Sequence, residues 1–441
     1  MRGHKQLISG IAALAIPAII TNITTPILGL TDMAIVGHIG GAVLIAAIAV
    51  GGSAFNMLYW LCGFLRMGTS GLTAQYFGAH DSKSCSTVLA RAMIVAMSIG
   101  VSIVVLQQPV FNGIMMFMDC DDATRITVHT YFSICIWGAP AVLGTFVLTG
   151  WWLGMQNSRT PMWVSIFINL FNISVSLIMV FGGGLHIEGV AIGTLSAQWA
   201  GFLLGTWLCK RKYTITIPPL CQLLQWAEIK KFFRINTDIF LRTICLVCVT
   251  MWFTRIGAMQ GALMLAVNAL LMQLFTLFSF FMDGFAFAAE ALCGRFKGSG
   301  NITMLRRTVR TLMTSAGVVA LTFTIIYALA GNEALRLLSS DRQVISTSGE
   351  YYRWAVSIPL SGFAAFMWDG VSIGISATRR MLMSMLCSTA LFFLIYAIAY
   401  PMTGNHGLWL AFIAYLLTRG IALWLLNRKY LHQESEPYSA R

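Results

Sequence analysis

The chain has 441 residues, of which 57% are hydrophobic and only 10% are charged, against roughly 25% charged residues in a soluble domain. This composition excludes an ordinary soluble protein and predicts a polytopic membrane protein. The formal net charge of +13 does not indicate a nucleic-acid partner, because the basic residues gather in the loops on one side of the predicted membrane topology.

Apolar runs of about 20 residues, each long enough to cross a bilayer as a helix, recur along the whole chain. We therefore expect an all-α integral membrane protein with twelve transmembrane helices. The expected ranges are 8–36, 42–66, 86–110, 129–153, 161–184, 189–210, 232–256, 261–290, 308–331, 351–374, 381–402 and 407–428. The first run lacks a small-residue cleavage site, so it is interpreted as a membrane helix and not as a removable signal.

The distribution of Lys and Arg predicts the orientation of the chain. Alternate loops and both tails hold 21 of the 29 basic residues, whereas the opposite loops hold Arg125, Arg255, Arg336, Arg342 and Arg353. Because basic loops stay in the cytoplasm, both termini are expected to be cytoplasmic.

The chain aligns with itself when residue n is compared with residue n+220. Gly150 falls on Gly370, Gly154 falls on Gly374, and the segment 71–81 falls on 291–301. The same offset pairs Gly37, Gly41, Ala42, Ala46 and Ala49 with Gly257, Gly261, Ala262, Ala266 and Ala269. A nearly constant offset over about 200 residues indicates an internal duplication.

The duplication predicts the domain organisation. We expect an N-terminal six-helix lobe at 1–213, a cytoplasmic linker at 214–231, a C-terminal six-helix lobe at 232–430 and a cytoplasmic tail at 431–441. Because six is an even number, both lobes keep the same orientation and are related by a pseudo-two-fold axis along the membrane normal. Parallel repeats of this kind are typical of transporters that hold their substrate between the repeats.

The first span carries an acidic residue within an apolar helix. Asp32 shares an arc of about 80° with Asn22, Thr25 and Gly29, and Pro26 lies six residues before it. A carboxylate at the bilayer centre costs about 2.5–3.5 kcal/mol, so it normally faces a bundle interior or a wet cavity. We expect Asp32 to couple transport to an ion and Pro26 to act as a hinge. The alternative is that Asp32 anchors the outer end of the helix.

The fifth span has a second polar face. Ser165, Asn169, Asn172 and Ser176 lie within an arc of about 60°, although Ser and Asn also serve simply to hold neighbouring helices together. We prefer this structural interpretation for Ser165 and Ser176. Asn172 beside Asp32 would offer an amide oxygen and a carboxylate, which is a seat for a proton or Na+.

The second lobe is richer in acids. Asp283 and Glu290 share an arc of about 80° with Asn268 and Thr276 on one helix and form a proton-accepting column, while Asp369 is a third candidate. Glu290 lies near the cytoplasmic end, where simple solvation is the alternative. Asp238 and Arg242 are expected to form an i, i+4 salt bridge. The residues expected to line a substrate cleft are Asn22, Thr25, Asn169 and Asn268.

No enzymatic motif stands out in the chain. The sequence has no Walker loop, no HExxH and no GxSxG, so it is not expected to be an enzyme or to need a cofactor. Transport energy would then come from a gradient of H+ or Na+.

Several runs resemble one family. PILGLTDMAIVGHIG, FLRMGTSGLTAQYFGA, GMQNSRTP, NLFNISVSL, MDGFAFAAEA, WDGVSIGISATRR and GNHGLWLA are similar to segments of the multidrug and toxic compound extrusion (MATE) family, and most similar to its DinF-like branch. The resemblance implies two six-helix bundles around a V-shaped cleft. It also implies secondary antiport, in which cationic or amphipathic drugs are exported in exchange for H+ or Na+.

The resemblance extends to particular residues. The family's acid after the first-span proline matches Asp32, and its fifth-span Asn matches Asn172. Ser176 stands where relatives often carry Asp, which favours H+ over a Na+ site with two carboxylates. The expected partners are a drug-like small molecule and membrane lipid, without nucleic acid. We expect a monomer in the bacterial inner (plasma) membrane.

Three alternatives have to be weighed against antiport of drugs. A lipid-precursor flippase of the same superfamily should show a cationic cleft, whereas Asp283, Glu290 and Asp369 are expected to be three isolated acids. An exporter of organic anions such as citrate is a second alternative. A channel or receptor fits poorly with duplicated lobes.

Overall fold

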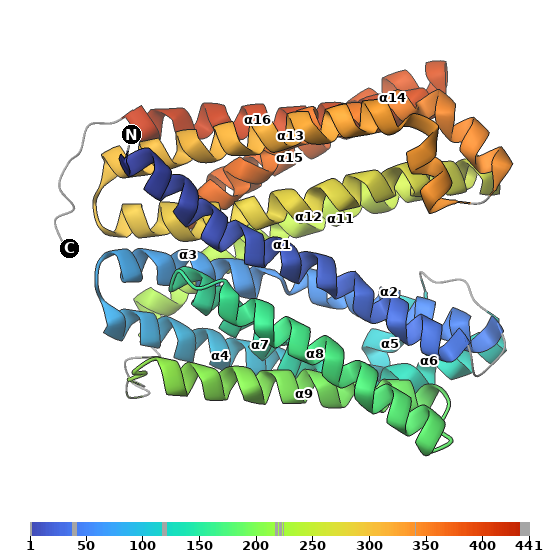
Figure 1. The fold of residues 1–441 in the computed structure, drawn as a ribbon, viewed down its shortest axis with the longest axis horizontal. Helices are drawn as coiled ribbons and strands as arrows, with labels where there is room; N and C mark the ends of the chain where they lie inside the picture. The colour runs from blue at the N-terminus through green and yellow to red at the C-terminus, as the bar shows by residue number, and fades with distance from the viewer. Residues whose placement is uncertain are drawn as a thin grey trace. The chain divides into compact units, whose positions relative to one another are not determined.

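The computed structural model describes residues 2–37, 42–116, 121–216, 219, 223, 225–339 and 341–432. The chain is 92% helical, and the described residues contain no strand (Figure 1). Within them, twelve helical segments are long and apolar enough to cross a membrane. The predicted all-α fold with twelve membrane spans is thereby confirmed.

The first half contains eleven helical segments in the described residues. They are α1 (Arg2–Gly37), α2 (Ala42–Leu61), α3 (Phe64–Gly78), α4 (Ser82–Val105), α5 (Gln107–Met115), α6 (Asp122–Cys135), a short 3-10 turn (Ile136–Gly138), α7 (Ala139–Gly154), α8 (Arg159–Leu177), which ends in a π-helical turn (Ile178–Gly182), and α9 (Ile187–Lys212). Two spans are therefore composite: the second joins α2 and α3, and the fourth joins α6 and α7.

The second half is built from longer, continuous helices. They are α11 (Trp226–Met259), α12 (Ala262–Gly298), α13 (Ile302–Leu338), α14 (Arg342–Gly374), α15 (Thr378–Thr403) and α16 (Asn405–His432). One exception lies inside α13, where Gly331 has non-helical backbone angles with φ 48°.

The chain divides into two compact units. The first unit comprises residues 20–232, and the second comprises residues 1–19 and 233–441. This division differs from the expected lobe boundaries, because the first half of α1 groups with the second unit. The reason is close packing on α12: a Cβ added at Gly284 would lie 2.3 Å from Ile19 Cγ1 and 3.0 Å from the carbonyl oxygen of Ala15.

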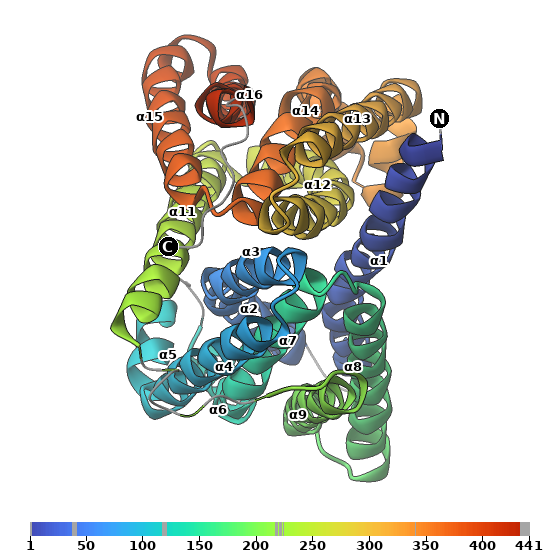
Figure 2. The same cartoon turned by 90° about the vertical axis from the view of Figure 1, so that its left-hand side faces the viewer.

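Each unit packs around its own buried aromatic residues. In the first unit α7 packs against α3, α4 and α9, α2 packs against α6, and α8 packs against α9. Trp151 and Trp152 are fully buried in its core. In the second unit α14 packs against α12, α13 and α16, and α15 packs against α16 (Figure 2). Its core includes Trp409 and Phe412.

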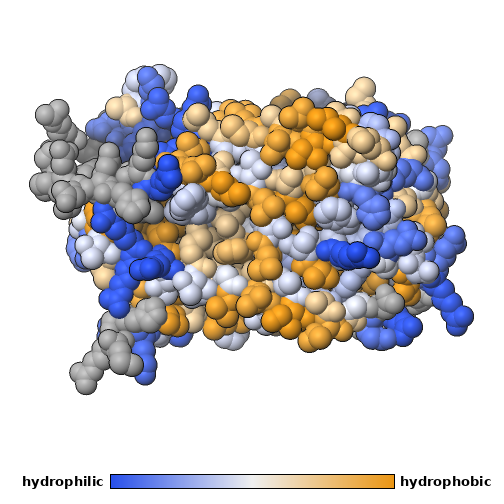
Figure 3. Space-filling model, turned by 90° about the horizontal axis from the view of Figure 1, so that it is seen from above, coloured by the Kyte–Doolittle hydropathy of each residue, from blue (hydrophilic) through white to orange (hydrophobic). Residues whose placement is uncertain are grey.

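Large apolar side chains also cover much of the outside, as expected for helices in lipid. Figure 3 shows hydrophobic side chains across the middle of one face and hydrophilic side chains toward both ends. Leu30, Trp163, Leu329, Ile398 and Met402 are among the exposed large hydrophobic residues.

The duplication is visible in the turns that join the helices. Positive φ angles occur at His80 and Gly300, at Gln156 and Ser376, and at Gly184 and Gly404, three pairs that are each 220 residues apart. The helix caps repeat with the same offset. The Asp81 side chain accepts from the amide of Ser84, and the Asn301 side chain accepts from the amide of Met304. Asp121 and Asp341 cap α6 and α14 in the same way.

The paired glycines meet equivalent partners inside the two units. A Cβ at Gly150 would lie 2.2 Å from the carbonyl oxygen of Arg66, and one at Gly370 would lie 2.4 Å from the carbonyl oxygen of Ala286. Arg66 and Ala286 are themselves 220 residues apart. The sequence repeat therefore corresponds to a repeat in helix packing.

Candidate functional site

The polar centre of the first unit is a chain of three side chains from three helices. Asn172 Nδ2 donates to Thr194 Oγ1 over 3.0 Å, and Thr194 Oγ1 donates to Asp32 Oδ2 over 3.2 Å. Asp32 is 3% exposed and Asn172 is fully buried. Donors aligned in one direction polarise each other toward the acceptor, so this chain stabilises negative charge on Asp32. The structure thus brings together Asp32 and Asn172, which were both predicted site residues.

Oxygen atoms without a partner surround this chain. Asp32 Oδ1, Asn172 Oδ1 and Ser176 Oγ are buried and have no hydrogen-bond partner among the described residues. No cationic side chain in the described part of the chain pairs with Asp32 either. Buried polar atoms are nearly always hydrogen-bonded in folded proteins, so a group of unsatisfied oxygens is suited to accept a proton or to bind a small cation.

Thr194 was not predicted as a site residue, and its position follows from the packing of α9. Small residues recur along one face of this helix at Gly189, Gly193, Ala197, Gly201 and Gly205. They allow close approach, as in other membrane helices with small residues four apart. A Cβ at Gly193 would lie 2.0 Å from Ser176 Oγ on α8, and the next residue is Thr194. The small residues along α9 were therefore the feature of the sequence from which Thr194 could have been predicted as a site residue.

The predicted hinge lies between two attachments of α1. On one side of Pro26, Asn169 Nδ2 donates to the carbonyl oxygen of Thr24 over 2.9 Å. On the other side Asp32 accepts from Thr194. Helix α1 continues through Pro26, although proline lacks the amide hydrogen that would donate four residues back.

Two further residues of the predicted cleft lie on the same part of α1. Asn22 is half-buried, whereas the side chain of Thr25 lies outside the described residues. Asn169 contacts the α1 backbone, so it has a structural bond that was not predicted.

The second unit contains a buried ion cluster around Asp369. Both Arg242 on α11 and Arg419 on α16 donate to Asp369 Oδ2, and all three residues are at most 9% exposed. The expectation that Asp369 is an isolated acid is wrong. A carboxylate between two permanent guanidinium cations is poorly suited to exchange protons, so this geometry indicates a structural role.

The same cluster corrects the expected pairing of Asp238 with Arg242. Asp238 accepts a hydrogen bond of 3.0 Å from Thr378 Oγ1, and its other oxygen lies 3.7 Å from Arg379 Nη1. Among the described residues the two therefore pair with other partners, because tertiary contacts outweigh the weak preference for local i, i+4 pairing.

Asn268 lies in a structural network and not on a cleft surface. Its amide exchanges two hydrogen bonds of 2.9 Å with the amide of Asn405, and its oxygen also accepts from Trp409 Nε1 over 2.9 Å. The side chain is 2% exposed. The prediction that it lines a substrate cleft is therefore replaced by a role in holding α12 to α16.

The remaining two acids both lie on α12. Glu290 is 1% exposed, which contradicts the interpretation that it is simply solvated. Asp283 is half-buried. No cluster of three or more His, Cys, Asp or Glu that could hold a metal occurs in the described ranges.

Twelve apolar helices in two repeated units, with a buried acid on a polar chain inside one of them, define a polytopic membrane transporter with internal duplication. The chain belongs to the MatE family, whose model matches residues 17–178 and 239–398. The two matched segments correspond to the two repeats. Members of this family are membrane transporters and not enzymes, as the sequence predicted.

Relatives of known name match almost the whole chain. DNA damage-inducible protein F of Escherichia coli (strain K12) is 34% identical over 420 residues, which cover 95% of this chain and 91% of the relative. Multidrug resistance protein MdtK of Edwardsiella ictaluri (strain 93-146) is 24% identical, covering 97% and 96%. The predicted similarity to the DinF-like branch is thereby confirmed.

Solved structures share the fold. One, described as the outward-facing conformation of a multidrug resistance MATE family transporter of the MOP superfamily, has a TM-score of 0.85 at 20% identity and covers 96% of this chain and 95% of its own. A MOP superfamily transporter from Pyrococcus furiosus Vc1 (DSM3638) has a TM-score of 0.83 at 19% identity, with coverages of 96% and 95%. At these identities the similarity concerns the fold alone.

Proposed function

We propose that the protein is a secondary active antiporter that exports cationic or amphipathic drugs in exchange for H+, or for Na+, by alternating access. The observation that carries this proposal is the environment of Asp32, which is buried in a membrane span, bonded through one oxygen and paired with no cation in the described chain. The name of one relative, multidrug resistance protein MdtK of Edwardsiella ictaluri, supports drugs as the substrate class.

The proposed coupling step is protonation of Asp32. As a carboxylate, Asp32 accepts a hydrogen bond from the Thr194 hydroxyl and attracts a cationic substrate. A proton entering from outside neutralises Asp32 and weakens this charge-assisted hydrogen bond. One of the two attachments that flank Pro26 is then altered, so α1 bends at Pro26 and the affinity for substrate falls on the outer side.

Ion and substrate need not share atoms in this mechanism. Coupling requires only that they favour opposite states, each by a few kcal/mol. Asn172 positions Thr194, and the oxygens of Asp32, Asn172 and Thr194 form the alternative Na+ seat. Asp283 and Glu290 stay candidates for a second coupling site, because both belong to the α12 face predicted to carry protons.

The orientation of the chain and the membrane in which it lies are proposed from the distribution of basic residues and from the bacterial relatives. The excess of Lys and Arg in alternate loops supports cytoplasmic termini, and the bacterial relatives support the inner membrane. We propose that a monomer, with the lobes at 1–213 and 232–430 and the linker at 214–231, is the transporting unit.

The test uses the purified full chain in proteoliposomes loaded with a lipophilic cationic dye. A pH gradient and a Na+ gradient are imposed separately, each with a gradient-free control. Dye movement driven by the pH gradient alone is expected. Movement with neither gradient imposed would contradict antiport.

The arginines around Asp369 give the alternatives some support. Two buried arginines meet at Asp369, so the second unit is not lined by acids alone, which weakens the argument against a flippase or an exporter of organic anions such as citrate. The same liposomes, loaded with labelled citrate or with a labelled lipid-linked sugar, distinguish these activities from drug export.

A further inference from the structure

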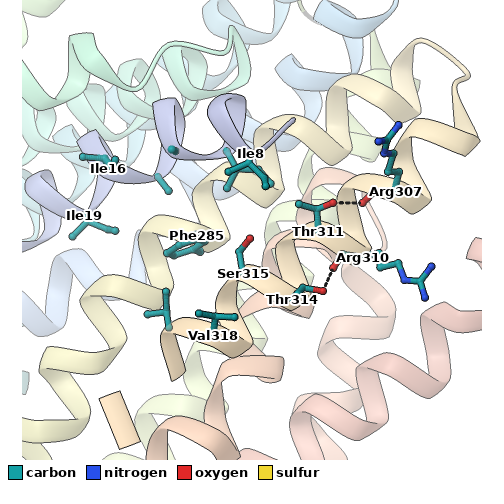
Figure 4. Close-up of a pocket in the computed structure, with 14 residues that line it drawn as sticks. Ile8, Ile16, Ile19, Phe285, Arg307, Arg310, Thr311, Thr314, Ser315 and Val318 are labelled. Carbon is teal, nitrogen blue, oxygen red and sulfur yellow. Dashed lines mark hydrogen bonds between the residues drawn. The ribbon is translucent and has the colours of Figure 1, made fainter. Parts of the chain in front are cut away.

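A groove in the second unit has apolar walls and a basic end. It has a volume of about 700 Å³ and lies between the first half of α1 and the first half of α13, with Phe285 of α12 also lining it. Figure 4 shows Arg307 and Arg310 at one end and Ile16, Ile19 and Phe285 toward the other. No acidic side chain is among the described residues that line it.

The apolar wall of this groove faces the outside of the helix bundle. Ile8, Ile16 and Val318 line it and are 45%, 57% and 60% exposed. All three lie in segments apolar enough to cross a membrane, so the groove opens toward the hydrocarbon region. A helix rises about 1.5 Å per residue, so the wall from Arg310 to Val318 is about 12 Å long. A hydrocarbon chain fits such a surface.

The charged end is suited to a phosphate group. Arg307 and Arg310 are exposed, lie one helical turn apart on α13, and pair with no acid among the described residues. The hydroxyls of Thr311 and Thr314 donate to the carbonyl oxygens of the same two arginines, which leaves the guanidinium groups as the polar donors at this end. Arginine forks match the geometry of phosphate oxygens.

We propose that this groove binds an anionic glycerophospholipid, with one acyl chain along α1 and α13 and the phosphate at Arg307 and Arg310. Basic pockets between membrane helices on the cytoplasmic side commonly bind anionic headgroups. The predicted topology places the start of α13 on that side. The lipid would fasten residues 1–19, the part of α1 that groups with the second unit, to α13.

A second groove provides an internal comparison. It has a volume of about 510 Å³, lies among α13, α14 and α16, and no charged residue is among the described residues that line it. A purely hydrophobic preference for lipid would fill both grooves alike. The proposal assigns selectivity for anionic lipid to the first groove only.

The test measures lipid retained by the purified full chain in native mass spectrometry, with phosphatidylglycerol and phosphatidylcholine offered at equal concentrations. The wild type is expected to retain phosphatidylglycerol preferentially. Each basic residue near a membrane surface contributes about fivefold in affinity, so R307A/R310A is expected to lose about 30-fold. The matched control R342A/R353A removes two exposed arginines from α14, and its retention of lipid should equal that of the wild type.

A second pair of variants tests the apolar wall. Ile16→Trp fills the first groove and Ile421→Trp fills the second; the two residues are 57% and 55% exposed. Only Ile16→Trp is expected to displace phosphatidylglycerol. The proposal is overturned if R307A/R310A retains phosphatidylglycerol as the wild type does, if phosphatidylcholine is retained equally well, or if inorganic phosphate alone raises the wild-type melting temperature as much as the lipid. Lipid retention is independent of dye transport, so failure here leaves the proposed antiport untouched.

Discussion

Thr194 Oγ1 donates to Asp32 Oδ2 over 3.2 Å and receives a hydrogen bond from Asn172 at the same time. The hydroxyl therefore links the acid on α1 to the amide on α8 through a third helix. Because of this position, a variant that lacks the Thr194 hydroxyl should still fold but should lose ion-coupled transport.

Thr194→Val preserves the size of the side chain and removes the donor. A hydrogen bond to a charged group contributes about 1.5–3 kcal/mol, so dye transport driven by a pH gradient is expected to fall about tenfold or more. Thr194→Ser keeps the hydroxyl and should transport at a rate close to that of the wild type. Transport by a well-folded Thr194→Val protein at the wild-type rate would show that this bond has no part in coupling.

The ion cluster of the second unit should contribute to stability. Asp369→Asn removes the buried carboxylate to which both Arg242 and Arg419 donate, and breaking a buried ion pair in this way costs about 3–5 kcal/mol. We expect a clear fall in melting temperature in detergent. Glu333→Gln, in an exposed pair with Arg336, is the control and should cost at most about 1 kcal/mol. Normal stability of Asp369→Asn combined with lost coupling would instead assign Asp369 to the transport cycle.

Close helix packing in both repeats depends on paired glycines. Gly370→Ala would place a Cβ 2.4 Å from the carbonyl oxygen of Ala286, and a backbone atom cannot move aside cheaply. Overpacking of this kind costs about 1–3 kcal/mol, so the melting temperature should fall. Gly150→Ala should lower the melting temperature by a similar amount. Gly52→Ala is the control, because nothing lies within 4 Å of its added Cβ. Equal melting temperatures for all three would contradict the packing repeat.

The cap of α4 should make stability depend on pH. Burial opposes ionisation of Asp81, but hydrogen bonds from Ser84 outweigh it and lower its pKa below the ordinary 3.8. A lowered pKa gives stability that is present above the ordinary value and lost as pH falls through the folded value. Asp81→Asn, which reproduces the Asn301 cap of the second repeat, should therefore differ most from the wild type near neutral pH and converge with it as the pH falls through the lowered pKa of Asp81.

Melting curves recorded from neutral pH to below the ordinary Asp value of 3.8 measure this effect. The reverse change, Asn301→Asp, should add the same dependence to α13. A constant difference between the wild type and Asp81→Asn across this range would show that the carboxylate does not contribute as a charged cap.

The spans and the duplication could be predicted from the sequence because both depend on patterns that are visible along the chain itself. Bilayer thickness fixes the length of an apolar helix, and the offset of 220 residues pairs turns and caps such as Asp81 with Asn301. Asp32 and Asn172 could be predicted as neighbours because polar side chains in membrane helices commonly form hydrogen bonds with polar side chains of neighbouring helices.

The partners of Asp369 could not be predicted in the same way. Arg242 and Arg419 lie 127 and 50 residues away from it, and only the packing of α11, α14 and α16 brings them together. Asn268 was misassigned for a related reason, since Asn405 lies 137 residues away. Polar residues on one helix face indicate contact with something, but the sequence does not say whether that is substrate or another helix.

The most direct measurement is efflux of a cationic dye from proteoliposomes under an imposed pH gradient, comparing the wild type with Asp32→Asn and with Asp341→Asn, a control at an exposed helix cap. The account predicts that Asp32→Asn abolishes gradient-driven efflux, whereas the wild type and Asp341→Asn transport equally. Undiminished efflux by Asp32→Asn would contradict it and remove Asp32 from the mechanism.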